Sequence, residues 1–241
     1  MSPSRSGANL RAMQRLRFLP LLLLTACGGA PGALAPSGMG ALTDVEARRW
    51  AAETQPGGNQ EIRFRFVFTD KRSAAAKGQG SASVAGADSL RFDFRGPLGA
   101  GRGAAVVIGD SAQWVQPKDQ VDKLVPSYPL LWAMLGRARP PAGVVDLRGL
   151  RDEKVTAWRY ISGADTVDYL RSRDGLRLMA EVRQAGKRIG IVTTTFGPDG
   201  VLLKSRLDVP SGPARLDLTF TRVTKPGSFS AEIWDAPRDS L

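Results

Sequence analysis

The sequence EIRFRFVF, residues 61–68, decides the fold class because apolar and polar side chains alternate along it. Successive side chains of a β-strand point to opposite faces of a sheet, so this period of two predicts a strand with one apolar and one wetter face. The apolar face would carry Ile62, Phe64, Phe66 and Phe68, and the other would carry Arg63, Arg65 and the less polar Val67.

The same alternation recurs farther along the chain and predicts a large antiparallel sheet. At residues 90–95, Leu90, Phe92 and Phe94 alternate with charged neighbours, and shorter examples follow at 189–193 and 216–220. Residues suited to tight turns separate the later apolar runs, as expected for hairpins. These turns lie at 173–175, 185–186 and 198–200.

Two short helices are expected beside the sheet. Thr43 and Glu46 have the spacing of a capping box, which predicts a helix that starts at Thr43. Residues 128–135 are almost entirely apolar, with Pro129 near their start and Gly136 after their end, as is typical of a helix. A helix that is apolar all round must be buried, either between other elements or across the open side of a curved sheet.

The N-terminal segment resembles the signal peptide of a bacterial lipoprotein. Four arginines precede an apolar run at residues 18–24, which is too short to span a bilayer, and Ala26 is the small residue that cleavage requires. Cys27, the only cysteine, follows where a lipobox cysteine stands. In such precursors the signal is removed and the cysteine is acylated, so a covalent acyl and diacylglycerol lipid on Cys27 is expected to anchor the protein. The alternative is an ordinary export signal with a chance cysteine.

The chain is expected to have three parts. Residues 1–26 form the signal peptide, and residues 27–40, which are uncharged and rich in glycine, alanine and proline, form a flexible tether. Residues 41–241 are long enough for a single domain with its own core. Gly28, rather than an acidic residue, follows the cysteine, which resembles lipoproteins sent to the outer membrane. We therefore expect a lipid-anchored protein that faces the periplasm.

Charge and composition argue against several functions. The net charge of +11 becomes +7 without the four arginines of residues 1–26, an excess that suits an anionic membrane surface but also a plainly solvated face. Nucleic acid is not expected as a partner of an exported protein. The chain has no histidine, so enzymatic activity, zinc sites and other metal or non-covalent cofactor sites are not expected. Acids such as Asp165, Asp168 and Asp174 read as solvated, and a carboxylate-based glycosidase is the one enzymatic alternative.

Three stretches together resemble the LolA/LolB family of lipoprotein-localisation proteins, and its LolB-like receptors in particular. The first runs from the lipobox cysteine through the tether and the capped helix to the strand at 62–68. The second is residues 90–114, in which Pro97, Leu98 and Gly99 are similar to the protruding loop of the receptors. The third is residues 129–136, similar to the short helix below the receptors' cavity mouth.

This resemblance implies a mainly β fold with helices (α+β). A curved antiparallel sheet would form an incomplete β-barrel, which short helices cover to enclose an apolar cavity for acyl chains. Each candidate lining residue could equally belong to an ordinary core, because alternation identifies a buried face but not what fills it. The candidates are Phe64, Phe66, Phe92, Phe94, Leu130, Leu131, Met134 and Leu135.

The resemblance also implies a function. A monomeric receptor would take lipoproteins from a LolA-like periplasmic carrier and insert them into the inner leaflet of the outer membrane. Leu98, held between Pro97 and Gly99, would contact the membrane, and a leucine folded back on the sheet rim is the alternative. A different class of function is a non-catalytic envelope module that scaffolds proteins or senses another apolar ligand.

Overall fold

The computed structural model describes residues 34–70, 73–86, 88–96, 102–109, 111–116, 126–143, 146–210 and 214–235. The chain divides into two compact units, Met1–Gly32 and Ala33–Leu241, and every described residue belongs to the second. The whole described core also lies in the second unit, so removing residues 1–26 takes nothing from that core. The predictions for Cys27 and for the turn of Pro97, Leu98 and Gly99 lie outside the described residues.

Thirteen strands and two α-helices, α1 (Asp44–Ala52) and α3 (Tyr128–Met134), make up most of the described chain, with a 3-10 helix η2 (Ala231–Trp234) near its end. The strands before α3 are β1 (Gly40–Ala41), β2 (Gln60–Asp70), β3 (Ser73–Ala85), β4 (Ser89–Arg95), β5 (Arg102–Ile108) and β6 (Ser111–Gln116). Those after it are β7 (Asp146–Arg151), β8 (Val155–Ser162), β9 (Asp165–Ser172), β10 (Arg177–Gln184), β11 (Lys187–Phe196), β12 (Leu202–Val209) and β13 (Ala214–Thr224). The expected turns at 173–175, 185–186 and 198–200 lie between β9, β10, β11 and β12, so these hairpin predictions are confirmed.

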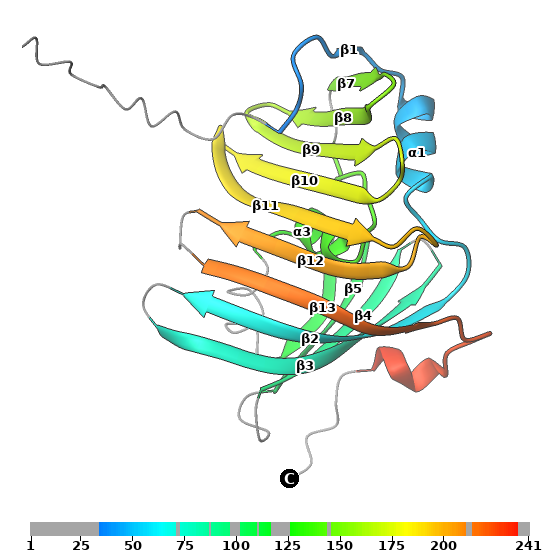
Figure 1. Cartoon of the computed structure of the whole chain (residues 1–241), viewed down its shortest axis with the longest axis vertical. Coiled ribbons are helices and arrows are strands. Elements are labelled where there is room, and N and C mark those ends of the chain that lie inside the picture. The colour runs from blue at the N-terminus through cyan, green and yellow to red at the C-terminus, as the bar shows by residue number, and fades with distance from the viewer. Residues whose placement is uncertain are drawn as a thin grey trace, which may run out of the picture. The chain divides into compact units, whose positions relative to one another are not determined.

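All described strands belong to one antiparallel sheet, in the order β1-β7-β8-β9-β10-β11-β12-β13-β2-β3-β4-β5-β6. Most neighbours are hairpins, but β1 joins the edge at β7, and β13 pairs with β2, which is distant in sequence. Figure 1 shows that the sheet curves strongly, so that β4 and β5 pass behind β13 and β2 while α3 lies inside the curve. The predicted mainly β fold, with one curved, open antiparallel sheet and short helices, is confirmed.

The alternation at residues 61–68 separates the two faces of the sheet as predicted. Phe64 and Phe66 are buried on the inner face, which is the face turned toward the core. Arg63 and Arg65 are exposed on the outer face. Burial of such large apolar side chains, worth roughly 2 to 3 kcal/mol each, fixes the register of β2, because a slip by one residue would exchange the two faces.

Helix α1 begins at the predicted capping box. The Glu46 amide donates to Thr43 Oγ1 at 3.3 Å, and the Thr43 amide donates to Glu46 Oε2 at 3.3 Å. These bonds satisfy two N–H groups that would otherwise lack partners at the helix start. The helix contacts β7, and the ring of Trp50 meets that of Trp158 edge to face with centroids 6.1 Å apart. This packing attaches α1 to the β7 and β8 end of the sheet.

Helix α3 is buried, as its apolar sequence predicts. Its residues from Leu130 to Met134 are at most 4% exposed, and it packs against β10, β11 and β12. Gly136 ends it with a φ of +76°, while the Arg137 amide donates to Trp132 O at 3.0 Å. This left-handed glycine lets the chain turn back at the helix end. None of the described helices is long and apolar enough to cross a membrane.

Candidate functional site

Four aromatic side chains singled out from the sequence come together on the inner face of the sheet. Phe64 and Phe66 lie on β2, and Phe92 and Phe94 lie on β4, two strands away. The rings of Phe64 and Phe92 stack with centroids 5.2 Å apart, and those of Phe66 and Phe94 meet edge to face at 6.1 Å. We call these four residues the phenylalanine face.

Glycines on neighbouring strands determine how these rings lie. Gly80 of β3 is opposite Phe64, and Gly103 of β5 is opposite Phe94. A Cβ atom at Gly80 would stand 2.5 Å from the ring of Phe64, and one at Gly103 would overlap the ring of Phe94. The rings therefore lie across the neighbouring strands, over positions that carry no side chain.

The phenylalanine face encloses little space with its described neighbours on β13. With Leu216 and Leu218 of β13 it surrounds a void of about 10 Å³. Such a void is about the size of one water molecule and holds no acyl chain. The space that these six described side chains surround is therefore too small for an acyl chain, and the cavity implied by the resemblance stays a prediction.

The second group of candidate lining residues lies on α3 and immediately after it. Leu130, Leu131, Met134 and Leu135 are at most 4% exposed and belong to the same core cluster as the phenylalanine face. A Cβ atom at Gly190 of β11 would stand 2.7 Å from Leu130 Cδ1, so the leucine occupies the space that this glycine leaves. The structure thus places the two candidate groups in different regions of one packed core.

Side-chain hydrogen bonds fasten α3 to both halves of the sheet. Thr194 of β11 donates through Oγ1 to Ala133 O at 2.7 Å. Trp132 donates through Nε1 to Gly109 O, in the turn between β5 and β6, at 2.7 Å. Because β11 and β5 are far apart in the strand order, α3 bridges the inside of the curve.

Arg137, just after α3, adds a third attachment. Its side chain is 1% exposed and donates to Gln60 Oε1 of β2 at 3.0 Å and to Gly86 O, after β3, at 3.1 Å. Burial lowers the pKa of its guanidinium to about 10, so the group keeps its charge at neutral pH. A buried cation is stable only where acceptors replace water, and these contacts hold the end of α3 in place.

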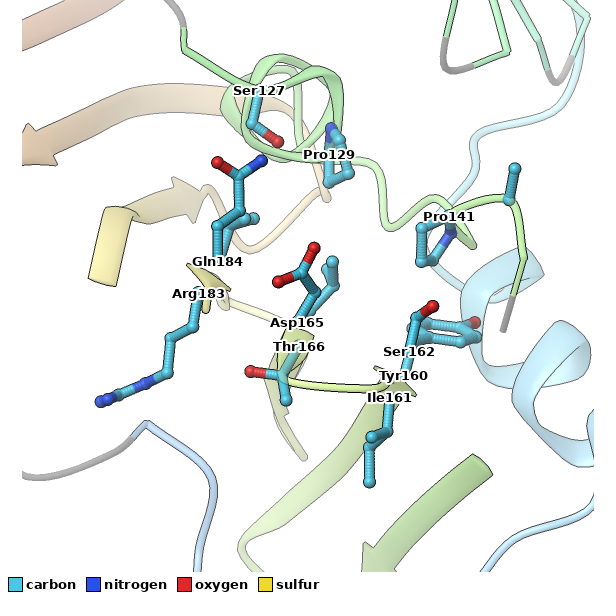
Figure 2. A pocket seen from close by; sticks show the side chains of 13 residues that line it. Ser127, Pro129, Pro141, Tyr160, Ile161, Ser162, Asp165, Thr166, Arg183 and Gln184 are labelled. Atoms are coloured by element: carbon cyan, nitrogen blue, oxygen red, sulfur yellow. The ribbon is translucent and has the colours of Figure 1, made fainter. Parts of the chain in front are cut away.

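A cleft of about 200 Å³ opens beside the start of α3. Figure 2 shows Ser127 and Pro129 on one side of it, Pro141 on another, and the ends of β8, β9 and β10 facing them. Sequence reasoning did not predict this cleft. The only signal for it was a pair of prolines, Pro129 and Pro141, on either side of the apolar helix.

The cleft has an apolar floor and a polar rim. Tyr160, Val167 and Val182 are opposite one another on β8, β9 and β10 and are buried. Burial raises the pKa of Tyr160 to about 12, so its hydroxyl remains neutral. Asp165 and Gln184 extend into the cleft at its rim (Figure 2). This combination suits a ligand with an apolar body and a polar end.

Asp168 is not solvated, contrary to expectation. Its side chain is 1% exposed on the outer face, and Arg159 donates to it at 2.5 and 2.8 Å from the neighbouring strand. This hydrogen bonding raises the pKa of the Arg159 guanidinium. Glu181, opposite Asp168 on β10, is equally buried and accepts from Arg183 and Arg188. Arg183 lies on β10 with Glu181, but Arg159 and Arg188 reach their acids from a neighbouring strand, which the sequence alone does not reveal.

Glu181 also holds part of the segment expected to be a flexible tether. The amide of Leu34 donates to Glu181 Oε2 at 3.1 Å, and Gly40 and Ala41 pair with β7. The stretch from Leu34 to Ala41 is therefore attached to the sheet at both of its ends.

In the described residues, no group of three histidine, cysteine, aspartate or glutamate side chains is placed to hold a metal ion.

Comparisons with known proteins identify the fold. No protein-family model matches the chain, and no curated protein matches it in sequence. Among solved structures, a LolA superfamily protein from Nitrosomonas europaea is similar, with a TM-score of 0.56 and 11% identity, covering 83% of this chain and 100% of that one. An outer membrane lipoprotein-sorting protein domain from Vibrio parahaemolyticus is also similar, with a TM-score of 0.52 and 11% identity, covering 79% and 95%. The chain therefore has a LolA-like fold.

Proposed function

We propose that this protein is a lipid-anchored envelope protein that binds lipoproteins by their acyl chains. It would deliver these lipoproteins to the outer membrane. The observation that carries the proposal is the apolar helix α3, buried inside a curved sheet whose inner face is apolar. The similar solved structures support it, since one is a LolA superfamily protein and the other an outer membrane lipoprotein-sorting domain.

Binding of acyl chains requires that side chains move. The cleft of about 200 Å³ and the void of about 10 Å³ are both smaller than the roughly 300 to 1,000 Å³ typical of ligand sites. Entering acyl chains would displace the phenylalanine rings or separate α3 from the sheet. The work of displacement weakens binding, which favours later release into a bilayer where the same chains are buried equally well. The process is transfer and breaks no bond.

Capture of an acylated peptide tests this proposal. Residues 27–241 carrying Cys27→Ser would be mixed with a triacylated lipoprotein peptide and with its unacylated twin, and binding measured by fluorescence anisotropy. We expect binding of the acylated peptide only, because each buried methylene contributes about 0.8 kcal/mol. Equal or absent binding of the two peptides would contradict the proposal.

A matched pair of variants locates the site in the same assay. Phe94→Asp places a charge on the phenylalanine face, where the side chain is 8% exposed, whereas Leu203→Asp places it on a side chain that is 48% exposed. We expect roughly tenfold or weaker capture for the first variant and unchanged capture for the second, since a buried charge opposes an apolar ligand. Equal capture by both would move the acyl site away from the phenylalanine face.

Leu98 is proposed to promote membrane insertion. The variant Leu98→Glu is expected to capture acylated peptide normally but to lose most delivery to vesicles, because a carboxylate resists entry into the apolar layer. Transfer of a labelled lipoprotein to sedimented vesicles measures this, with Leu203→Glu as the control on an exposed leucine elsewhere. Unchanged delivery by the Leu98→Glu variant would show that the residue has another role.

A scaffold or sensor for another apolar ligand is the second candidate function. Two observations favour it: the void beside the phenylalanine face is only about 10 Å³, and α3 is fastened to both halves of the sheet. Depleting a delivery receptor would mislocalise many lipoproteins, whereas depleting a scaffold would disturb few.

A further inference from the structure

The strand register places three arginines in one line across the outer face. Arg65 of β2 is opposite Gln79 of β3, Gln79 is opposite Arg95 of β4, and Arg95 is opposite Arg102 of β5. All four side chains are exposed. We call Arg65, Arg95 and Arg102 the basic row, and Lys204 of β12 extends it through Thr219 of β13.

The acids of this face do not neutralise the basic row. Each acid near it already forms an ion pair with a different arginine, and no ion pair within the described residues includes a member of the row. Within the described part of the chain, the positive charge of the row therefore has no ion-pair partner. The four pairs are Glu61 with Arg63 at 3.1 Å, Asp93 with Arg91 at 2.8 Å, Asp217 with Arg206 at 2.7 Å, and Asp208 with Arg215 at 3.0 Å.

The basic row is also unfavourable for the isolated domain. Arg95 and Arg102 are directly opposite on adjacent strands, an arrangement in which like charges destabilise a sheet. Strands lie about 4.8 Å apart, so Arg65 and Arg102 are separated by about 14 Å along the sheet, and their long side chains can reach a common surface. An anionic partner would remove the repulsion between them.

The chemistry of the surroundings distinguishes between possible partners. Protein interfaces are usually built around buried apolar and aromatic anchors. None of the exposed large apolar side chains of the described chain lies beside the three arginines: Val45, Leu176 and Val201 are on other elements, and Ile108 is at the opposite end of β5 from Arg102. Leu203 is next to Lys204 on β12, beyond β13 from Arg65. A group of exposed cations without an apolar centre suits lipid headgroups instead. Headgroups can move within the membrane until their spacing matches that of the arginines.

We propose that the basic row is a docking surface for the anionic headgroups of a membrane. The proposal rests on the proposed envelope function for its setting, but its test requires no lipoprotein. Arg95 ends β4 and Arg102 begins β5, so docking would place these two strand ends at the bilayer surface. Charge attraction would orient the domain, and acyl capture would remain a separate step.

Vesicle sedimentation of residues 27–241 with Cys27→Ser tests the docking surface. We expect binding to vesicles of equal parts phosphatidylcholine and phosphatidylglycerol, weaker binding in high salt, and none to phosphatidylcholine alone. The triple variant Arg65→Gln, Arg95→Gln, Arg102→Gln should bind the anionic vesicles roughly 100-fold more weakly. Lysine at the same three positions should restore binding, because headgroup attraction depends on charge more than on geometry.

A second triple variant controls for net charge. Arg49, Arg173 and Arg177 are exposed and lie on α1, in the turn after β9 and at the start of β10. Changing these three to glutamine alters the net charge equally and should leave vesicle binding nearly unchanged. Equal loss by both triple variants, or no loss by the first, would overturn the proposal. Failure of lysine to restore binding would overturn charge attraction as the cause, in favour of paired hydrogen bonds from arginine to headgroup phosphates.

The acyl-capture assay separates this proposal from the proposed function. The variant without the basic row should capture acylated peptide as the parent chain does, which also shows that it is folded. If the parent captures no acylated peptide but binds anionic vesicles through the row, the docking surface stands and the delivery function fails. If the parent captures acylated peptide but does not bind anionic vesicles, only the docking surface fails.

Discussion

Arg159→Met is expected to lower the free energy of unfolding by about 3 kcal/mol. The change keeps most of the side-chain stem but removes both hydrogen bonds to Asp168, at 2.5 and 2.8 Å, and strands a carboxylate that is 1% exposed. Buried charges are tolerated only when they are paired, so most of the loss comes from Asp168 and not from the arginine itself. Urea unfolding of residues 27–241, followed by circular dichroism, measures the change.

The same sheet offers a matched control. Arg206 of β12 and Asp217 of β13 are also directly opposite, at 2.7 Å, but their side chains are 52% and 33% exposed. Exposed pairs contribute about 0 to 1 kcal/mol, so Arg206→Met should cost less than about 1 kcal/mol. Similar losses for the two variants would mean that water reaches Asp168 in solution and that the outer face is less closed there than the structure indicates.

Cys27→Ala is expected to release the protein from the membrane. Each acyl chain contributes about 0.8 kcal/mol per buried methylene, so loss of two or three chains removes more than about 10 kcal/mol of membrane affinity. The basic row, with three exposed arginines, would retain only weak and salt-sensitive attachment to anionic membranes. Mass spectrometry of the purified protein and sedimentation of cell membranes, washed with salt, measure the two consequences.

Thr25→Ser is the control for this variant, since it changes a residue of the same segment while keeping the cysteine. It should remain acylated and attached to membranes. An alanine variant that still sediments after the salt wash would place the anchor elsewhere. A parent protein whose mass shows no lipid would favour the alternative of an ordinary export signal.

The apolar elements were predictable because their own residues determine them. The alternation at 61–68 separates the two faces of β2, and a helix as apolar as residues 128–135 is stable only when it is buried. Thr43 and Glu46 similarly define the start of α1 without reference to the rest of the chain. In each case a local pattern has one stable outcome, and the structure agrees with it.

Features that depend on a neighbouring strand were not predictable. The sequence of β3 is rich in serine, alanine and glycine and lacks apolar alternation. It pairs with β2 and β4, and the ring of Phe64 occupies the space beside Gly80. This contact is visible only once the strand register is known. Asp168 is buried for the same reason, since Arg159 reaches it from the adjacent strand.

The candidate site shows the same limit. Alternation correctly indicated that Phe64, Phe66, Phe92 and Phe94 are buried, but not whether the rings stand into an open interior or lie along the sheet. Glycines on β3 and β5 decide this, because they leave room for rings to lie flat. The cleft beside α3 was missed since it is assembled from the ends of three strands and two prolines.

The bond between the Leu34 amide and Glu181 sets the reach of the protein. Only seven residues lead from Cys27 to Leu34, and a fully extended chain of that length spans at most about 25 Å. In the proposed lipidated protein, this part of the tether is shorter than the hydrocarbon core of the bilayer, which is about 30 Å thick. The domain could not extend across the periplasm to meet its donor. If the proposed delivery function holds, a soluble carrier would have to travel to the membrane surface, and the anchored protein could meet its cargo only by diffusing within the plane of the membrane.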